Sequence, residues 1–168
     1  MTVAIVALGS NLGDSLDTLA RAVAALDADP SVHVRAVSPW YSSIAHAADG
    51  PAADAPRYVN GVAIVDADCS ALELLRCLQL IEVELGRPAD HARWTDRTVD
   101  LDLIVFGGEH HVGGDLTVPH PRAHERIFVL QPWSDLDPNA EIPGRGAVAE
   151  LIARCPEDER AALQQVGS

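Results

Sequence analysis

Apolar residues follow strand spacing in some segments of the chain and helical spacing in others, and the order of these segments constrains the fold. Short apolar runs with β-branched residues predict strands over residues 2–8, 32–41, 58–65 and 99–106. Apolar residues at helical spacing predict helices over residues 16–26 and 72–85. The order strand–helix–strand–strand–helix–strand is the split βαβ pattern, so we expect an α+β fold, a ferredoxin-like βαββαβ sandwich.

Polar residues and a glycine mark where these two helices begin and end. Asp14 or Ser15 can cap the first helix. Ser70, followed three residues later by Glu73, predicts a capping box at the start of the second helix. Gly86 predicts the end of that helix.

The rest of the chain predicts a loop and a set of C-terminal additions. Residues 45–56 are rich in Ala, Asp, Gly and Pro, which predicts a mobile loop. Beyond the fourth strand we expect a short hairpin over residues 109–118, a helix over residues 126–133 and another from about residue 147. No repeat or linker divides the sequence, so we expect a single domain over residues 1–168. A ligand on such a sheet would lie on the face that the helices leave uncovered.

The charge composition excludes several classes of function. The chain carries 25 acidic and 12 basic residues, a net charge of −13, which disfavours nucleic acid and anionic lipid as partners. All 12 basic residues are Arg. A P-loop and a protein kinase each require a specific Lys, so both nucleotide-binding designs are excluded. Any phosphate chemistry must therefore rest on Arg, magnesium and backbone amides.

Neither the cysteines nor the apolar runs indicate a secreted or membrane protein. Cys69, Cys77 and Cys155 show no metal-ligand spacing and cannot pair evenly, which favours reduced thiols. Residues 1–6 lack a basic region and predict a first strand rather than a signal peptide. No apolar run approaches the roughly 20 residues that cross a bilayer. We expect a cytoplasmic protein.

Two aspartates in the fourth strand are the first candidates for a functional site. Strand alternation predicts that Asp100 and Asp102 share one face, about 6.6 Å apart along the strand. It predicts the opposite face for Val99, Leu101, Leu103 and Val105. Two neighbouring carboxylates suit magnesium, which takes one or two carboxylates together with waters and phosphate oxygens. The alternative is a solvated strand face that carries two acids without a function.

Arginines crowd the polar stretch just before this strand. Arg87, Arg93 and Arg97 lie within it, in a chain otherwise poor in positive charge. The guanidinium group binds phosphate oxygens bidentately, and metal ions with Arg are what a phosphoryl-type transfer requires. The alternative is surface ion pairing with neighbouring carboxylates. Trp94, in the same stretch, is either an aromatic lid or a packing residue.

Two further polar residues are candidates for ligand binding. His120 stands between two prolines, which hold it rigidly, so it could donate a hydrogen bond to a phosphate or a base. Asn60 lies on the third predicted strand and offers both a donor and an acceptor to the edge of a heterocycle. For both residues the alternative is a purely structural role.

In chain order, several segments together resemble one family, the 6-hydroxymethyl-7,8-dihydropterin pyrophosphokinases of folate biosynthesis. The matching segments are residues 7–14, 58–60, 79–82, 93–94, 97–103 and 116–121. The most specific are Arg-Thr-Val-Asp-Leu-Asp-Leu at 97–103 and the Leu-Thr-Val-Pro-His-Pro that follows at 116–121. The resemblance spans nearly the whole chain.

The resemblance implies an enzyme that transfers the diphosphate of ATP to the pterin hydroxymethyl oxygen and releases AMP. It implies two Mg²⁺ ions on Asp100 and Asp102, with ATP as co-substrate, and it implies catalytic roles for Arg87, Arg97, Asp100 and Asp102. It places ATP contacts at Gln79, Glu82, Arg87, Arg97, Leu103, Thr117, His120 and Arg126. It places pterin contacts at Ser43, Tyr58, Asn60, Trp94, Asp100 and Phe128. We expect a monomer that binds neither nucleic acid nor membranes.

The sequence departs from the family pattern in three places. Residues 42–46 read Ser-Ser-Ile-Ala-His where the family has a Thr-x-Pro-x-Gly type of segment. Residues 89–91 read Ala-Asp-His where extra basic residues are frequent, and Thr95-Asp96 replaces the usual Gly-Pro. These loops leave two alternatives: a diverged homologue that binds the same ligands but turns over weakly, and a ferredoxin-like binding module without catalysis.

Overall fold

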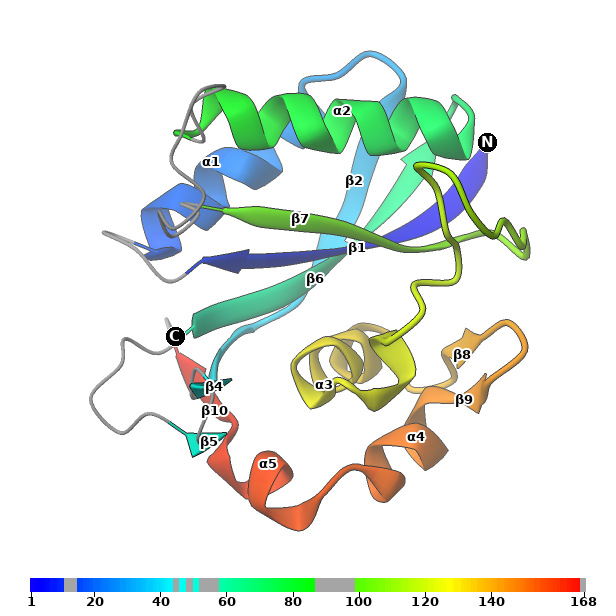
Figure 1. Ribbon diagram of the computed structural model, residues 1–168. Coiled ribbons are helices and arrows are strands. Elements are labelled where there is room, and N and C mark those ends of the chain that lie inside the picture. The colour runs from blue at the N-terminus through cyan, green and yellow to red at the C-terminus, as the bar shows by residue number, and fades with distance from the viewer. Residues whose placement is uncertain (11–14, 44–45, 48–49, 52–57, 87–98, 167–168) are drawn as a thin grey trace.

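The chain folds into an antiparallel sheet with helices on both of its faces (Figure 1). The computed structural model describes residues 1–10, 15–43, 46–47, 50–51, 58–86 and 99–166. The helices are α1 (Ser15–Asp27), α2 (Ala71–Glu84), the 3₁₀ turn η1 (Ala123–Glu125), α3 (Ile127–Leu136), α4 (Val148–Arg154) and α5 (Glu157–Ala162). The strands are β1 (Thr2–Ser10), β2 (Val32–Val37), β3 (Trp40–Ser43), β4 (His46–Ala47), β5 (Gly50–Pro51), β6 (Tyr58–Ala67), β7 (Asp100–Phe106), β8 (Glu141–Ile142), β9 (Gly146–Ala147) and β10 (Gln164–Val166).

Among the described residues, the main sheet has six strands. Five of them follow the order β10-β3-β6-β1-β7, and the sixth, β2, pairs with residues 63–67 of β6, whereas β3 pairs with residues 58–60. β1 runs antiparallel to both β6 and β7. This pairing places Gly9 directly opposite Asn60 on one side and opposite Asp100 on the other. Two candidate site residues that are 40 positions apart in the sequence therefore flank one glycine of the central strand.

The second predicted strand is two strands in the structure. β2 and β3 both pair with β6, and the ladder is interrupted at Ser38 and Pro39. Proline has no N–H to donate to a ladder. Here the Ser38 hydroxyl accepts a hydrogen bond from the N–H of Val62 at 2.9 Å, so a side chain replaces a backbone partner. The chain still follows β6 on both sides of the break.

The helix signals agree with the structure. Ser70 caps α2, and its capping box with Glu73 has both reciprocal hydrogen bonds, 3.1 and 2.8 Å long. Gly86 follows the helix with a φ of 117°, a conformation that glycine adopts without steric cost. α1 begins at Ser15. The other cap candidate, Asp14, lies outside the described residues.

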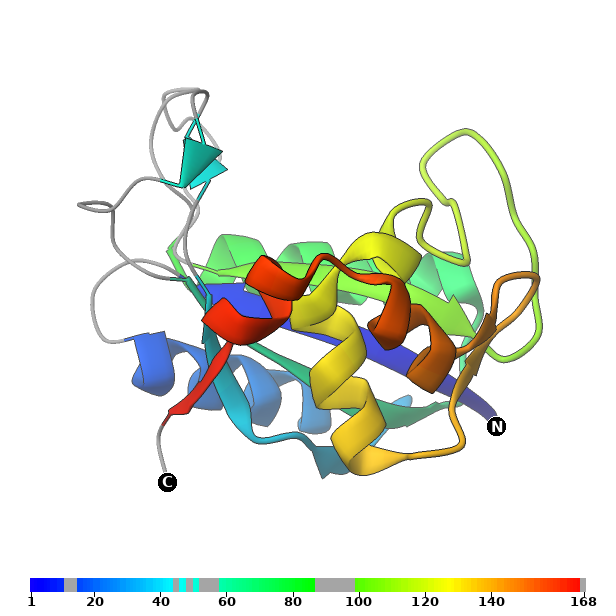
Figure 2. The ribbon, with the colours of Figure 1, turned by 90° about the horizontal axis from the view of Figure 1, so that it is seen from below.

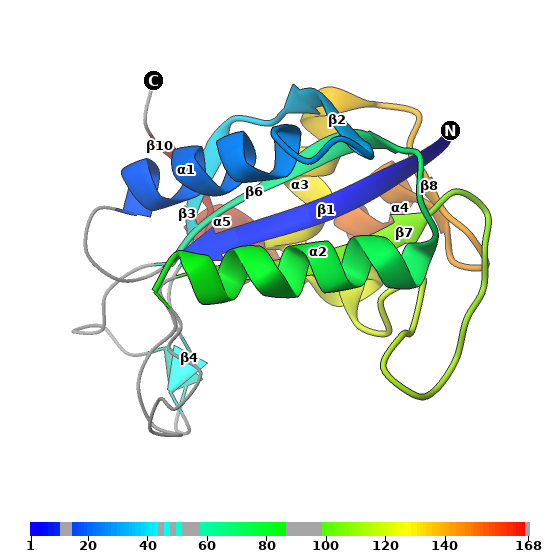
Figure 3. The same ribbon diagram turned by 90° about the horizontal axis from the view of Figure 1, so that it is seen from above.

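Apolar side chains fill both sides of the sheet. α1 and α2 lie next to each other on one face, as Figure 3 shows, and bury Leu19, Leu26, Leu74 and Leu78 against it. α3 and α4 cover the opposite face, where Leu130 and Trp133 pack against the strands (Figure 2). The C-terminal helices cover part of the face that α1 and α2 leave free.

The alternation along β7 breaks after Leu103. Leu101 and Leu103 face α1 and α2 as predicted, but Val105 packs with Ile104 on the α3 side. The register shows the reason. Val6 pairs with Leu103 and Ile5 with Val105, so Ile104 is an extra residue, a β-bulge that reverses the phase of the strand. The prediction for Val105 is wrong, whereas Asp100 and Asp102 precede the bulge and keep their common face.

The C-terminal third differs most from expectation. The hairpin predicted over residues 109–118 is reduced to one bridge between His111 and Val118. The helices predicted at 126–133 and from 147 are present as α3 and α4. α5 and β10 were not predicted. The loop predicted over residues 45–56 contains the two-residue strands β4 and β5, and the remainder of it lies outside the described residues.

The three cysteines are free thiols. Burial raises the pKa of all three, that of Cys77 to about 12. Such thiols stay protonated and unreactive near neutral pH.

Across the described ranges, the helices are all too short or too polar to cross a lipid bilayer.

Candidate functional site

A cavity of about 460 Å³ lies between the sheet and the C-terminal helices. It is lined from β1 by Ala7, Leu8 and Gly9, from β6 by Tyr58 and Asn60, from β7 by Asp100 and Asp102, from the segment 122–129 by Arg122, Glu125, Arg126, Ile127, Phe128 and Val129, and from α5 by Asp158, Glu159 and Ala162. Residues far apart in the sequence thus form one concave surface with aromatic, amide, carboxylate and guanidinium groups. Such a combination is typical of a small-molecule site.

Asp100 and Asp102 both line this cavity and are both half-buried. They pair with Gly9 and Ala7 of β1, which fixes the strand that carries them. On its other side, the buried carboxylate of Glu82 accepts a hydrogen bond from the N–H of Leu101 at 3.3 Å. The two carboxylates fit magnesium, which needs one or two acidic ligands and completes its shell with water and phosphate. Within the described residues, no group of three or more His, Cys, Asp or Glu forms a fuller metal cage.

Another part of the cavity suits a flat heterocycle. Tyr58 and Phe128 contribute aromatic rings, and Asn60, which is 8% exposed, contributes an amide. The guanidinium carbon of Arg126 lies over the Phe128 ring, 5.7 Å from its centre. That distance is a cation–π contact, which holds the arginine at the cavity wall.

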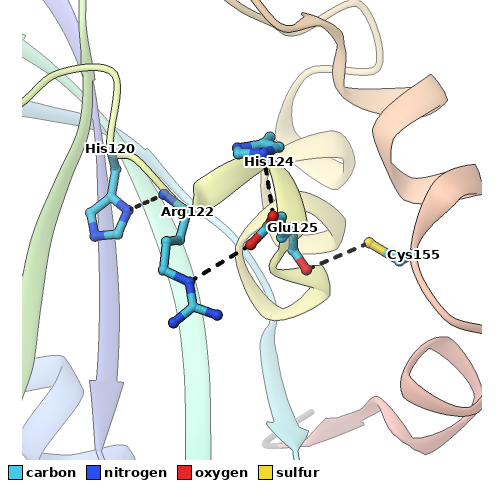
Figure 4. Close-up of polar contacts among 5 residues, drawn as sticks. All are labelled: His120, Arg122, His124, Glu125 and Cys155. Carbon is cyan, nitrogen blue, oxygen red and sulfur yellow. Dashed lines mark hydrogen bonds and ion pairs between the residues drawn. The ribbon is translucent and has the colours of Figure 1, made fainter.

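His120 lies on the segment that leads from β7 into η1 (Figure 4). Its backbone N–H donates to the carbonyl of Ile104 at 2.8 Å, and its Nδ1 accepts from the N–H of Arg122 at 3.2 Å. Burial lowers the pKa of His120; Arg126 and Arg122 lower it further, whereas Asp102 acts in the opposite direction. A neutral imidazole with Nδ1 as acceptor carries its proton on Nε2, where it can donate to a ligand.

Figure 4 also shows how Glu125 connects this segment to its surroundings. Its carboxylate lies 3.7 Å from Nε of Arg122 and 3.6 Å from Nε2 of His124. Its backbone carbonyl is 4.0 Å from the thiol of Cys155 just after α4. Glu125 therefore anchors the turn that presents Arg122 and Arg126 to the cavity.

Five described residues with expected nucleotide contacts do not line the cavity: His120 and four others. Gln79 is exposed on α2, and Glu82 is buried with its contact to Leu101. Leu103 is 4% exposed and belongs to the core under α1 and α2. Thr117 is half-buried on the loop before His120. These positions surround β7 rather than the aromatic end of the cavity.

The predicted arginine cluster of Arg87, Arg93 and Arg97 lies outside the described residues, as does Trp94. Ser43 ends β3 with its backbone opposite Tyr58, and only its backbone is described. Their roles stay predictions.

The cavity also contains residues to which the sequence assigned no role. Gly9 belongs to the first segment that matches the family, and that match was the available signal. Arg122 follows the His120 segment directly. Glu125, Asp158 and Glu159 belong to short runs of charge that look like ordinary exposed helix surface, and nothing in those runs indicated a cavity.

Comparisons with known proteins show which family the chain resembles. A family model described as 7,8-dihydro-6-hydroxymethylpterin-pyrophosphokinase (HPPK) matches residues 5–138. The 2-amino-4-hydroxy-6-hydroxymethyldihydropteridine pyrophosphokinase of Pseudomonas aeruginosa is 44% identical over 90% of this chain and 90% of its own length. The protein of the same name from Bacillus subtilis is 38% identical over 80% of this chain and 77% of its own length.

A solved structure shares the fold at low sequence identity. Wild-type Plasmodium falciparum HPPK-DHPS, crystallised with SDX-DHP, superposes with a TM-score of 0.67 and 12% identity over 92% of this chain. The chain spans 43% of that longer protein. The family match and the two bacterial relatives confirm the resemblance seen in the sequence, and the chain belongs to the 7,8-dihydro-6-hydroxymethylpterin-pyrophosphokinase family.

Proposed function

We propose that this chain transfers the diphosphate of ATP to the hydroxymethyl oxygen of 6-hydroxymethyl-7,8-dihydropterin and releases AMP, a step of folate biosynthesis. Membership of the family makes the chain a pyrophosphokinase. One observation carries the rest of the proposal: Asp100 and Asp102 line the same cavity as Tyr58, Asn60 and Phe128. A transfer between two substrates requires such adjacency, because rate is gained by holding the reacting groups side by side.

Asp100 and Asp102 form the phosphate end of the proposed site. Two magnesium ions on these carboxylates would neutralise charge on the triphosphate and leave its β-phosphorus open to the acceptor oxygen. The pairing of β7 with β1 and the Glu82 contact to Leu101 hold both carboxylates on one rigid strand. Rigid placement supports this chemistry, which depends on positioning and charge more than on covalent catalysis.

We propose that Arg87 and Arg97 contact the phosphates and assist the transfer, since both lie in the polar stretch of sequence before this strand. His120 would donate from Nε2 to the nucleotide, and Arg126 would contact it from the start of α3. Gln79, Glu82, Leu103 and Thr117 are proposed as further nucleotide-side positions on the strength of the family resemblance.

The pterin would stack between Tyr58 and Phe128, with the Asn60 amide at its hydrogen-bonding edge and Asp100 near its hydroxymethyl group. Gly9 supports this arrangement because its missing side chain leaves room beside Asn60. The backbone of Ser43, opposite Tyr58, and the ring of Trp94 are proposed to complete the pocket.

We further propose that the fold is ferredoxin-like, supported by the strand order and the antiparallel pairing of β1 with β6 and β7. Residues 1–168 would form one domain, because the same sheet contributes to the core on each of its faces. A monomeric, cytoplasmic protein remains our proposal, on its strongly acidic composition and its free thiols.

The test is AMP release from ATP, magnesium and 6-hydroxymethyl-7,8-dihydropterin. We expect release that requires all three components, and its absence would overturn the proposal. A diverged homologue with weak turnover, suggested by residues 42–46 and 89–96, would bind both ligands yet release little AMP. In a binding module without catalysis, Asp100→Ala would leave the affinity for MgATP unchanged, whereas the proposed site predicts its loss.

A further inference from the structure

The segment that contains α5 and β10 forms one wall of the cavity. α5 contributes Asp158, Glu159 and Ala162 to the lining. β10 then pairs with β3, with Gln164 opposite Ser42 and Val166 opposite Trp40. Figure 2 shows this segment in red, running from α4 across to the edge of the sheet. The pairing with β3 fixes α5 over the opening between the sheet and α3.

The strand order places this wall at the heterocycle end of the cavity. β10 pairs with β3, and β3 pairs in turn with β6, where Tyr41 lies opposite Asn60 and Ser43 opposite Tyr58. β7, which carries Asp100 and Asp102, is at the opposite edge of the same sheet. α5 therefore leads into the edge of the sheet on the side of Tyr58 and Asn60, across from β7.

Core packing does not explain the position of α5. None of its residues is buried. Asp158 and Glu159, which line the cavity, come directly after a third acidic residue, Glu157. Glu157 is exposed and does not line the cavity. The segment also lies beyond residues 5–138, which the family model matches. Its orientation presents carboxylates to the ligand space without adding to either core.

We propose that Asp158 and Glu159 are specificity-determining residues that accept hydrogen bonds from the N–H groups of the bound pterin. The inference rests on the proposed function. A reduced pterin is neutral and carries several N–H donors, which a carboxylate accepts strongly. The same carboxylates repel phosphate groups. They thus favour the heterocycle at this end of the cavity and direct the triphosphate towards β7.

The test compares two variants with a matched control. Asp158→Asn combined with Glu159→Gln keeps the shape of both side chains and removes their charges. Glu157→Gln removes a charge from the same helix turn without changing the cavity lining. For each protein, pterin affinity is measured by fluorescence titration with magnesium and a non-hydrolysable ATP analogue present, and KM is measured for both substrates.

We expect the double variant to bind the pterin about tenfold more weakly, because its hydrogen bonds to the pterin no longer involve a charged acceptor, while the KM for MgATP changes little. Glu157→Gln should match the wild type. Unchanged pterin affinity in the double variant, an equal loss in Glu157→Gln, or an equal rise of both KM values would each overturn the inference. The proposed function fails separately, if the wild type binds the pterin but releases no AMP.

Discussion

Gly9 is the position where the smallest substitution should have the most specific effect. In β1 it pairs with Asn60 on one side and with Asp100 on the other. A Cβ atom at Gly9 would lie 2.8 Å from Oδ1 of Asn60, closer than the 3.4 Å at which ordinary contact begins. Gly9 is not among the glycines with positive φ, so alanine fits its backbone conformation. Among protein atoms the added methyl group would press most closely on the Asn60 side chain, and it would also enter the cavity that Gly9 lines.

The expected magnitude follows from that contact. The Asn60 amide has to move by about 0.6 Å or rotate, and such overpacking costs roughly 1–3 kcal/mol. The stiffer unfolded chain of the alanine variant offsets about 0.4–1 kcal/mol of this cost. We expect a net loss of about 1 kcal/mol in the free energy of unfolding, measured by urea denaturation. A displaced Asn60 would also lose the hydrogen bond proposed between it and the pterin, which should weaken pterin binding about tenfold, measured by fluorescence titration.

Gly108→Ala is the control for Gly9→Ala. Nothing lies within 4 Å of a Cβ at Gly108, and its φ is also not positive. This variant should keep the stability and pterin affinity of the wild type or gain slightly in stability. If Gly9→Ala binds the pterin as tightly as Gly108→Ala does, the assignment of Asn60 to the pterin edge is wrong.

Three further predictions address the metal strand, a helix cap and a tyrosine. Asp102→Asn should reduce AMP release about a hundredfold or more and shift its magnesium dependence to higher concentration. The circular dichroism spectrum should stay the same. An unchanged magnesium titration would refute the metal role of Asp102. Ser70→Ala removes the hydroxyl that accepts a hydrogen bond from the N–H of Glu73 and should cost about 1 kcal/mol in urea denaturation without affecting KM. No loss would mean that the cap is not formed in solution. Burial, with a hydrogen bond to Asp135, raises the pKa of Tyr41 to about 12. As the pH rises, the unfolded chain therefore loses this proton at a lower pH than the folded chain does. The free energy of unfolding should fall between about pH 10 and 12. Tyr41→Phe should reduce this loss of stability. The ionisation of Tyr41 can be followed by tyrosinate absorbance, because the chain has only one other tyrosine. Equal ionisation of both tyrosines near pH 10 would contradict the burial argument.

The sequence predicted those parts of the fold that local spacing determines. α2 has the expected cap at Ser70 because a capping box depends on residues three positions apart. Asp100 and Asp102 share a face because strand alternation extends over three residues without interruption. The family resemblance then predicted which distant segments meet, and Tyr58, Asn60, Arg126 and Phe128 do lie together with the aspartates in one cavity.

The features that were missed depend on partners that local spacing cannot reveal. The bulge at Ile104 arises from the register between β7 and β1, so the phase reversal at Val105 has no signal within β7 itself. α5 buries none of its residues and β10 is three residues long, which leaves no apolar periodicity to detect. Placing Glu159 in the cavity requires knowing that β10 pairs with β3, more than 120 residues earlier in the chain.

The cavity has a thermodynamic consequence beyond the chemistry that it houses. Its walls come from five stretches of chain, around residues 7–9, 58–60, 100–102, 122–129 and 158–162, so no fragment of the protein contains it. A ligand that requires all five binds the folded state and not the unfolded one. Ligand occupancy then adds RT ln(1 + [L]/Kd) to the stability of the entire molecule, about 2.7 kcal/mol at a hundred times Kd. In a cell, substrate supply would thus set how long each copy of this small protein survives proteolysis.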